Sequence, residues 1–204
     1  MELDSTYLHF KRVIMKILLT GSAGFIGNNL AQKLLARGDI VSGVDNLNAY
    51  YDVNLKQARL NKIISHKNYT HINENISNKE NIYEIFKTNQ PEIVVNLAAQ
   101  AGVRHSISNP EDYINSNIIG FQNILDASKD FKPQHIVFAS SSSVYGANKT
   151  LPFSTQDNVD HPLNLYAASK KANELVSHAY SHIYEIPMTG LRFFTVYGPW
   201  GRPD

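Results

Sequence analysis

The stretch Thr20-Gly21-Ser22-Ala23-Gly24-Phe25-Ile26-Gly27 decides the fold of this 204-residue chain. It follows a short apolar run, residues 16–19, that suits a buried parallel strand, and it precedes apolar residues at helical spacing. Gly21, Gly24 and Gly27 therefore mark a corner where a strand turns into a helix. In such a corner the first glycine permits the tight turn, the second lets the backbone approach a ligand, and the third lets the helix pack closely on the strand.

This corner predicts a cradle for a diphosphate. The first turn of a helix leaves backbone N–H groups free for an anion, so we expect Phe25 and Ile26 to contact a cofactor together with the three glycines. Glycine spacing of this kind is a weak signal by itself. A glycine-rich turn that joins a strand to a helix without any ligand is the alternative.

A second apolar run, residues 40–45, ends in an acid, Asp45, a little under twenty residues after the last glycine. A carboxylate at the end of this strand reaches the ribose hydroxyls of a dinucleotide. It also repels a 2′-phosphate, so Asp45 predicts NAD rather than NADP, with Asn46 beside it as a further cofactor contact. The alternative, an acid that caps a helix or a turn, is disfavoured by the two motifs together.

Composition limits the other classes of function. The formal net charge of +1 offers no electrostatic attraction to nucleic acid or to an anionic membrane, so we expect neither partner. No apolar run approaches the roughly 18 residues of a membrane span. The absence of cysteine excludes disulfides and thiolate metal sites and fits a cytoplasmic protein. Residues 1–14 are expected to be an N-terminal extension before a domain that covers residues 15–204.

Strands and helices alternate along the rest of the chain. Beyond the first strand, the expected strands are residues 40–45, 69–72, 92–97, 134–139 and 188–194. The expected helices follow the glycine corner and cover residues 55–64, 79–88, 113–130 and 165–185. This alternation predicts an α/β fold, a doubly wound parallel sheet of the Rossmann type with helices on both faces. Ala98 and Ala99 follow the fourth of these strands, where small side chains keep a cofactor crevice open.

Two residues on the last expected helix carry candidate chemistry. Tyr166 and Lys170 are four residues apart, which places the phenol and the ammonium on one face of the helix. A free phenol has a pKa of about 10, and a nearby ammonium favours the phenolate, so Lys170 is expected to make Tyr166 a base. Ser141, at the end of the fifth strand, is the first choice to hydrogen-bond a substrate oxygen, with Ser142 next. The alternatives are a solvated Tyr–Lys pair and an ordinary serine loop.

The same helix carries a histidine pair that does not indicate a metal site. His178 and His182 are four residues apart, but no Glu follows the first and no third ligand is evident, so we expect no metal. The expected apolar side of this helix is formed by Leu175, Val176, Ala179 and Ile183.

Taken together, these motifs resemble those of the extended short-chain dehydrogenases/reductases, and most closely the NAD-dependent nucleotide-sugar epimerases of the UDP-glucuronate 4-epimerase type. The resemblance covers residues 15–204 and rests on TGSAGFIG, DNLNAYYD, NLAAQAGVRHS, SSSSVYG, YAASKKANE and RFFTVYGPWGRPD. It implies an isomerase of nucleotide-sugar metabolism, with a role in polysaccharide biosynthesis, that oxidises C4 of a UDP-sugar transiently and returns the hydride on the other face. Tyr166 would be the base, Lys170 its tuner and ribose ligand, and Ser141 the hydroxyl partner.

The resemblance also implies further contacts and one limit. Thr195 and Arg202 become candidates to bind the sugar carboxylate, and a homodimer is expected. Related sugar dehydratases carry Thr-Asp-Glu where this chain has residues 141–143, all serine, which favours epimerisation over elimination. Asn75 replaces an Asp that contacts adenine in many relatives. The C-terminal substrate lobe is expected to be largely missing, and a catalytically silent NAD-binding module or fragment is the alternative.

Overall fold

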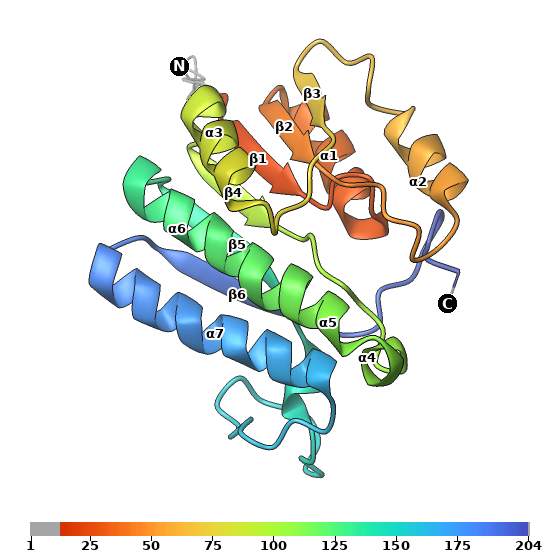
Figure 1. Ribbon diagram of the computed structural model, residues 1–204, viewed down its shortest axis with the longest axis vertical. Coiled ribbons are helices and arrows are strands. Elements are labelled where there is room, and N and C mark those ends of the chain that lie inside the picture. The colour runs from red at the N-terminus through yellow and green to blue at the C-terminus, as the bar shows by residue number, and fades with distance from the viewer. Residues whose placement is uncertain (1–12, 204) are drawn as a thin grey trace, which may run out of the picture.

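Six parallel strands form one sheet in the order β3-β2-β1-β4-β5-β6, with helices on both faces (Figure 1). A computed structural model describes residues 13–203 of the chain. Most of the expected N-terminal extension, residues 1–12, lies outside the described residues. The strand order reverses between β1 and β4, and in open parallel sheets ligands bind at such a switch point. The predicted doubly wound α/β fold is thereby confirmed.

The sequence expectations match most of the element boundaries. The strands are β1 Lys16–Thr20, β2 Ile40–Val44, β3 Tyr69–Ile72, β4 Ile93–Asn96, β5 His135–Ser141 and β6 Met188–Phe193. The helices are α1 Phe25–Arg37, α2 Val53–Leu60, α3 Lys79–Asn89, α4 His105–Ser108, α5 Pro110–Tyr113, α6 Phe121–Phe131 and α7 Leu165–Tyr184. A π-helical segment η1, Ile114–Gly120, and a 3-10 turn η2, Ser142–Tyr145, complete the set.

Two elements differ from the expectation. The single helix expected over residues 113–130 is a run of α5, η1 and α6, whose middle is wound as a wider π-helix. Such segments are rare and frequently lie at functional sites. The fifth strand also runs further than expected and contains Ser140 and Ser141, so these two serines belong to the sheet and not to a loop.

Two apolar clusters cover the two faces of the sheet. Leu18 of β1 points into a cluster with α3 and α6, against which side chains of α7 also pack. Its neighbours Ile17 and Leu19 point the other way, toward α1 and α2. This alternation follows from the period of two of a strand, and Figure 1 shows α3, α6 and α7 together on one face. The helices therefore hold the carboxyl ends of the strands in fixed register.

The exposed side of α7 corrects one sequence expectation. Leu175 and Ile183 are 59% and 63% exposed, and Ala179 is exposed too, so these apolar residues do not face the core. Only Val176 of the expected apolar side packs against the main cluster. Helical periodicity located the apolar stripe of α7 correctly but could not tell which side the sheet occupies.

Ile124→Ala in α6 should lower the free energy of unfolding by about 2–5 kcal/mol, because the side chain is fully buried and its removal leaves a cavity. Ile64→Ala is the matched control, because Ile64 is 46% exposed and its truncation should cost less than about 0.5 kcal/mol. Urea denaturation of the ligand-free protein measures both. Equal losses would contradict the assignment of the core.

Candidate active site

A cavity of about 660 Å³ opens at the carboxyl ends of the strands, at the switch point of the sheet. The glycine corner, the ends of β2, β4 and β5, the start of α7 and the chain after β6 all contribute to its wall. Its lining includes most of the expected site residues, namely Gly21, Gly24, Phe25, Ile26, Gly27, Asp45, Asn46, Ala98, Ala99, Ser141, Tyr166, Lys170, Thr195 and Arg202. The fold therefore brings together motifs that are scattered along the sequence.

The glycine corner is built for close approach of backbone to backbone. Gly21 has a φ of 72°, a left-handed conformation, and a Cβ there would lie 2.8 Å from the backbone nitrogen of Ala98. A Cβ on Gly27 would overlap the carbonyl oxygen of Gly21, so only glycine lets α1 begin here. Among the described residues no side chain caps α1, and its first turn carries no acid. The N–H groups at its start are thus available to an anion in the cavity.

Asp45 is fixed beside this corner by two backbone donors. Its Oδ2 accepts a hydrogen bond from the backbone N–H of Ala23 at 3.0 Å, and its Oδ1 accepts one from Leu47 at 2.9 Å. Both oxygens are therefore oriented by the backbone, in one case by the corner itself. Asn46 and Asn75 line the same part of the cavity.

The loop after β4 is held by a residue that sequence reasoning missed. Asn117, in the π-helical segment η1, is 1% exposed. Its side chain accepts from the backbone N–H of Gln100 at 2.8 Å and donates to the Gln100 carbonyl at 3.0 Å and to Ser169 Oγ at 3.0 Å. The sequence offered no clear signal, because Asn117 is one of three consecutive polar residues, 115–117, in the INSNIIG run. Asn117 thus fixes the loop that carries Ala98 and Ala99.

Tyr166 and Ser141 meet in the cavity. Burial raises the pKa of Tyr166, while a hydrogen bond with the Ser141 side chain and the nearby charge of Arg202 act to lower it. Burial has the larger effect, so the phenol is protonated at neutral pH. The expectation that the pKa of Tyr166 is lowered is therefore not met.

Lys170 lies one turn further along α7 and is 2% exposed. Its ammonium donates to the backbone carbonyl of Ala139 at 2.8 Å. Burial lowers the pKa of Lys170 to about 8. Lys170 is thus a buried amine in the wall of the cavity, one helical turn from Tyr166. The side chains that act to lower the pKa of Tyr166 are those of Ser141 and Arg202.

A second polar cluster lies behind these residues and was not anticipated. Glu174, one turn after Lys170, accepts from Ser140 Oγ at 2.5 Å and binds the Arg192 guanidinium through two hydrogen bonds of 2.9 Å. These contacts hold the pKa of Glu174 below its usual range despite partial burial. The cluster joins α7 to β5 and β6 immediately before Ser141. The YAASKKANE motif contained this Glu, but its partner lies on another element.

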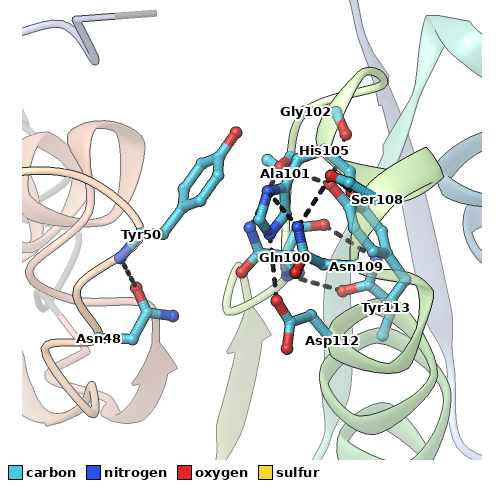
Figure 2. A network of polar contacts seen from close by, with 11 residues as sticks. Asn48, Tyr50, Gln100, Ala101, Gly102, His105, Ser108, Asn109, Asp112 and Tyr113 are labelled. Atoms are coloured by element: carbon cyan, nitrogen blue, oxygen red, sulfur yellow. Dashed lines mark hydrogen bonds and ion pairs between the residues drawn. The ribbon is translucent and has the colours of Figure 1, made fainter.

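The loops over the cavity meet around Tyr50. Figure 2 shows Tyr50, from the loop after β2, reaching toward His105 and Gly102, and the two rings lie 4.8 Å apart. His105 also contacts Asp112 at 3.1 Å. The Arg202 guanidinium lies 5.7 Å from the Tyr50 ring centre. Tyr50 therefore connects the loops after β2 and β4 with the chain after β6.

One expected site residue, Ser142, lies outside the cavity. Ser142 is half-buried in η2 and is not part of the cavity lining. His178 and His182 are exposed on α7. Across residues 13–203 no three His, Cys, Asp or Glu side chains gather closely enough to hold a metal ion. None of the helices in this range combines the length and the apolar character that crossing a membrane requires.

Comparisons with known proteins agree with this geometry. The model of the NAD dependent epimerase/dehydratase family matches residues 17–204. Protein CapI of Staphylococcus aureus is 61% identical over 93% of the chain, and a probable UDP-glucuronate 4-epimerase of Rhizobium meliloti is 44% identical over the same share. The chain spans 57% and 56% of the length of these two relatives.

The chain is also similar to solved structures of nucleotide-sugar 4-epimerases. The chain is similar to the crystal structure of UDP-glucuronic acid 4-epimerase from Bacillus cereus in complex with UDP-glucuronic acid and NAD, with a TM-score of 0.87 and 35% identity over 93% of this chain and 60% of that one. It is also similar to UDP-glucose 4-epimerase from Thermotoga maritima, with a TM-score of 0.82 and 33% identity over 93% and 58% of the two chains.

The buried amine yields a test by pH. From about pH 7 to about pH 10, the free energy of unfolding of the ligand-free wild type should rise relative to that of Lys170→Met. Folding lowers the pKa of Lys170 from 10.5 to about 8, so the unfolded chain binds more protons in this window and the penalty for burying the ammonium disappears as pH rises. The full shift corresponds to about 3 kcal/mol.

Urea denaturation at several pH values measures this difference. Lys33→Met, which removes an exposed lysine of α1, is the matched control and should differ from wild type by a constant amount. A difference between wild type and Lys170→Met that does not change with pH would show that the amine is not buried as described.

Proposed function

The chain belongs to the NAD dependent epimerase/dehydratase family, and from this premise we propose that the protein carrying it epimerises C4 of a UDP-sugar, with UDP-glucuronate and UDP-galacturonate as the pair. One observation carries the proposal: Tyr166, Ser141 and Lys170 meet at the end of the cavity that begins at the glycine corner. Relatives and solved structures named as UDP-glucuronate 4-epimerases support the choice of sugar.

The described residues fit NAD as the cofactor. The corner of Gly21, Gly24 and Gly27 with the uncapped start of α1 would hold the diphosphate, and the backbone of Phe25 and Ile26 belongs to the same turn. On the β2 side, Asp45 and Asn46 would bind the adenosine ribose, and the fixed carboxylate would exclude a 2′-phosphate. Toward the other end the lining is formed by Ala98, Ala99, Tyr166 and Lys170.

The chemistry of this chain's residues is proton transfer and orientation. NAD supplies hydride acceptance and return at carbon C4 when it is bound. Tyr166, as phenolate, takes the proton of the C4 hydroxyl, and Ser141 holds that hydroxyl by a hydrogen bond. Lys170 is buried and Tyr166 is half-buried in the cavity wall, which would limit the access of water to the reacting oxygen. Lys170, fixed by the Ala139 carbonyl, would bind a ribose hydroxyl and favour the phenolate once the site is filled.

We assign the carboxylate of the acidic sugar to the part of the cavity wall that is formed by the chain after β6. Thr195 and Arg202 line it after β6, and a guanidinium can bind a carboxylate through two hydrogen bonds. Ser142, which lies in η2 outside the cavity lining, is not included among the proposed substrate contacts. Elimination is disfavoured, because among the described lining residues the carboxylates are Asp45 and Glu74, on the β2 and β3 side of the sheet away from Tyr166.

We also propose a homodimer in the cytoplasm. Exposed apolar side chains gather on α7 and on η1, which pack against each other, and the most exposed are Leu175, Ile183, Ile114 and Ile119. Apolar surface of this kind marks interfaces between proteins. A chain without cysteine is compatible with a reducing compartment.

The assay that tests the function uses the whole protein with NAD and UDP-glucuronate. UDP-galacturonate should form, with almost no net change in nicotinamide absorbance. Tyr166→Phe should lower the rate by about a hundredfold or more, because it removes the acid–base group. Tyr83→Phe, on α3 and away from the cavity, is the matched control and should retain the wild-type rate.

The other outcomes separate the rival functions. NAD binding without product would favour a catalytically silent module. A stoichiometric change in nicotinamide absorbance would favour a net-redox reductase. Epimerisation of UDP-glucose at the same rate as UDP-glucuronate would contradict the choice of an acidic sugar as substrate.

Leu175→Glu combined with Ile183→Glu should convert the dimer into a monomer, because both apolar side chains of α7 would become charged at the interface. Analytical ultracentrifugation of the whole protein measures the mass. Ile64→Glu is the matched control, because Ile64 is 46% exposed and follows α2, which Figure 1 shows at the other edge of the sheet from α7. A dimer that persists in the double variant would place the interface elsewhere.

A further inference from the structure

Arg59 of α2 is a buried arginine whose role the proposed function leaves unexplained. It is 1% exposed, and within the described residues no carboxylate pairs with it. Burying a guanidinium costs free energy unless its donors are satisfied, so an unpaired buried Arg is a poor way to stabilise a helix. What its donors bind therefore indicates why it is there.

The donors of Arg59 bind segments that are distant in sequence. Nε and Nη2 donate to the carbonyl of Trp200 at 3.0 and 2.6 Å, and Nη2 also donates to the carbonyl of Gly201 at 3.2 Å. On the other side, Nη1 donates to the Tyr51 hydroxyl at 2.6 Å and to the carbonyl of Ala23 at 3.5 Å. One side chain thus joins the glycine corner, the loop after β2 and the chain after β6.

Lys62, two residues beyond the end of α2, supports the same attachment. The Lys62 ammonium lies 3.7 Å from the centre of the Trp200 ring. Trp200 itself has a φ of 65°, a left-handed conformation that is uncommon for a large side chain. Figure 1 shows the chain after β6 leaving the sheet and running up beside α2. These contacts attach residues 200 and 201 to the region of α2, and residues 194–203 are here called the 194–203 segment.

The attachment ends one residue before the proposed carboxylate ligand. Gly201 and Arg202 line the cavity, whereas Arg59 does not. Two consecutive tyrosines take part, because Tyr51 binds Arg59 and the ring of Tyr50 faces Arg202 at 5.7 Å. Fixing the carbonyls of residues 200 and 201 determines where the next side chain points.

We propose that Arg59 is the positioning residue for substrate selectivity: it fixes the 194–203 segment against the cofactor corner, so that Arg202 is held ready for the carboxylate of an acidic sugar. This inference rests on the proposed function. Because Arg59 also binds Ala23, whose N–H donates to Asp45, occupation of the cofactor end and order in the 194–203 segment are coupled, and the coupling acts in both directions.

Calorimetry of the NAD-loaded whole protein with UDP-glucuronate and with UDP-glucose tests the role. Arg59→Met should weaken UDP-glucuronate binding by about tenfold or more and raise KM with little change in kcat, while UDP-glucose binding changes little. Because Arg59 acts through Arg202, the double variant with Arg202→Met should bind no more weakly than Arg202→Met alone. Arg59→Lys, which keeps the charge but offers fewer donors, should fall between, and Lys33→Met is the charge-matched control.

Hydrogen exchange gives a readout that needs no substrate. In Arg59→Met the backbone N–H groups of the 194–203 segment should exchange faster while those of β1 and β4 stay protected; if this variant fails to fold, Arg59→Lys carries the same comparison. Unchanged exchange together with unchanged UDP-glucuronate affinity would overturn the proposal, as would equal weakening of both sugars or additive losses in the double variant. If the wild type does not bind UDP-glucuronate, the proposed function fails, and the exchange result alone still decides whether Arg59 fixes the segment.

Discussion

Two close backbone contacts at the glycine corner, Gly27 with Gly21 and Gly21 with Ala98, are the constraint on which the site depends. A Cβ at Gly27 would overlap the carbonyl of Gly21, and one at Gly21 would lie 2.8 Å from the nitrogen of Ala98. The first contact lets α1 begin directly after β1, and the second brings the end of β4 against the corner. The strand order reverses between these two strands, so the cavity opens where the backbones touch. Asp45 is oriented from the same corner, through the N–H of Ala23.

The long helix α7 shows how the site lowers the stability that its helices could provide. Its inward side carries the buried polar residues Lys170, Asn173 and Ser177, whereas Leu175 and Ile183 are exposed. Within the described residues the Ser177 hydroxyl has no hydrogen-bond partner. A helix selected only for stability would turn its apolar side inward. The opposite arrangement places the Lys170 amine in the cavity wall and leaves apolar side chains exposed, while the apolar clusters on the two faces of the sheet supply the stability.

The sequence predicted the elements well because their signals are local. Apolar runs, helical spacing and the glycine corner each lie within a few residues, and the cavity gathers nearly all the residues expected to line it. Contacts between distant residues could not be predicted in this way. Asn117 binds a residue 17 positions away, Glu174 binds Arg192 18 positions away, and Arg59 binds Trp200 141 positions away. No pattern within one element indicates such partners.

Under the proposed function, Arg202 would connect substrate recognition to the protonation state of Tyr166, the proposed base. In the ligand-free protein its charge helps to lower the pKa of Tyr166, against the larger effect of burial. A sugar carboxylate bound to Arg202 would neutralise that charge, so the acidic substrate removes one of the two effects that favour the phenolate. The Ser141 hydrogen bond and the buried Lys170 must then supply what the guanidinium no longer does. Under the proposed function, recognition of an acidic sugar would therefore require a base supported from inside the fold, and Lys170, fixed by the Ala139 carbonyl, is the group proposed for that support.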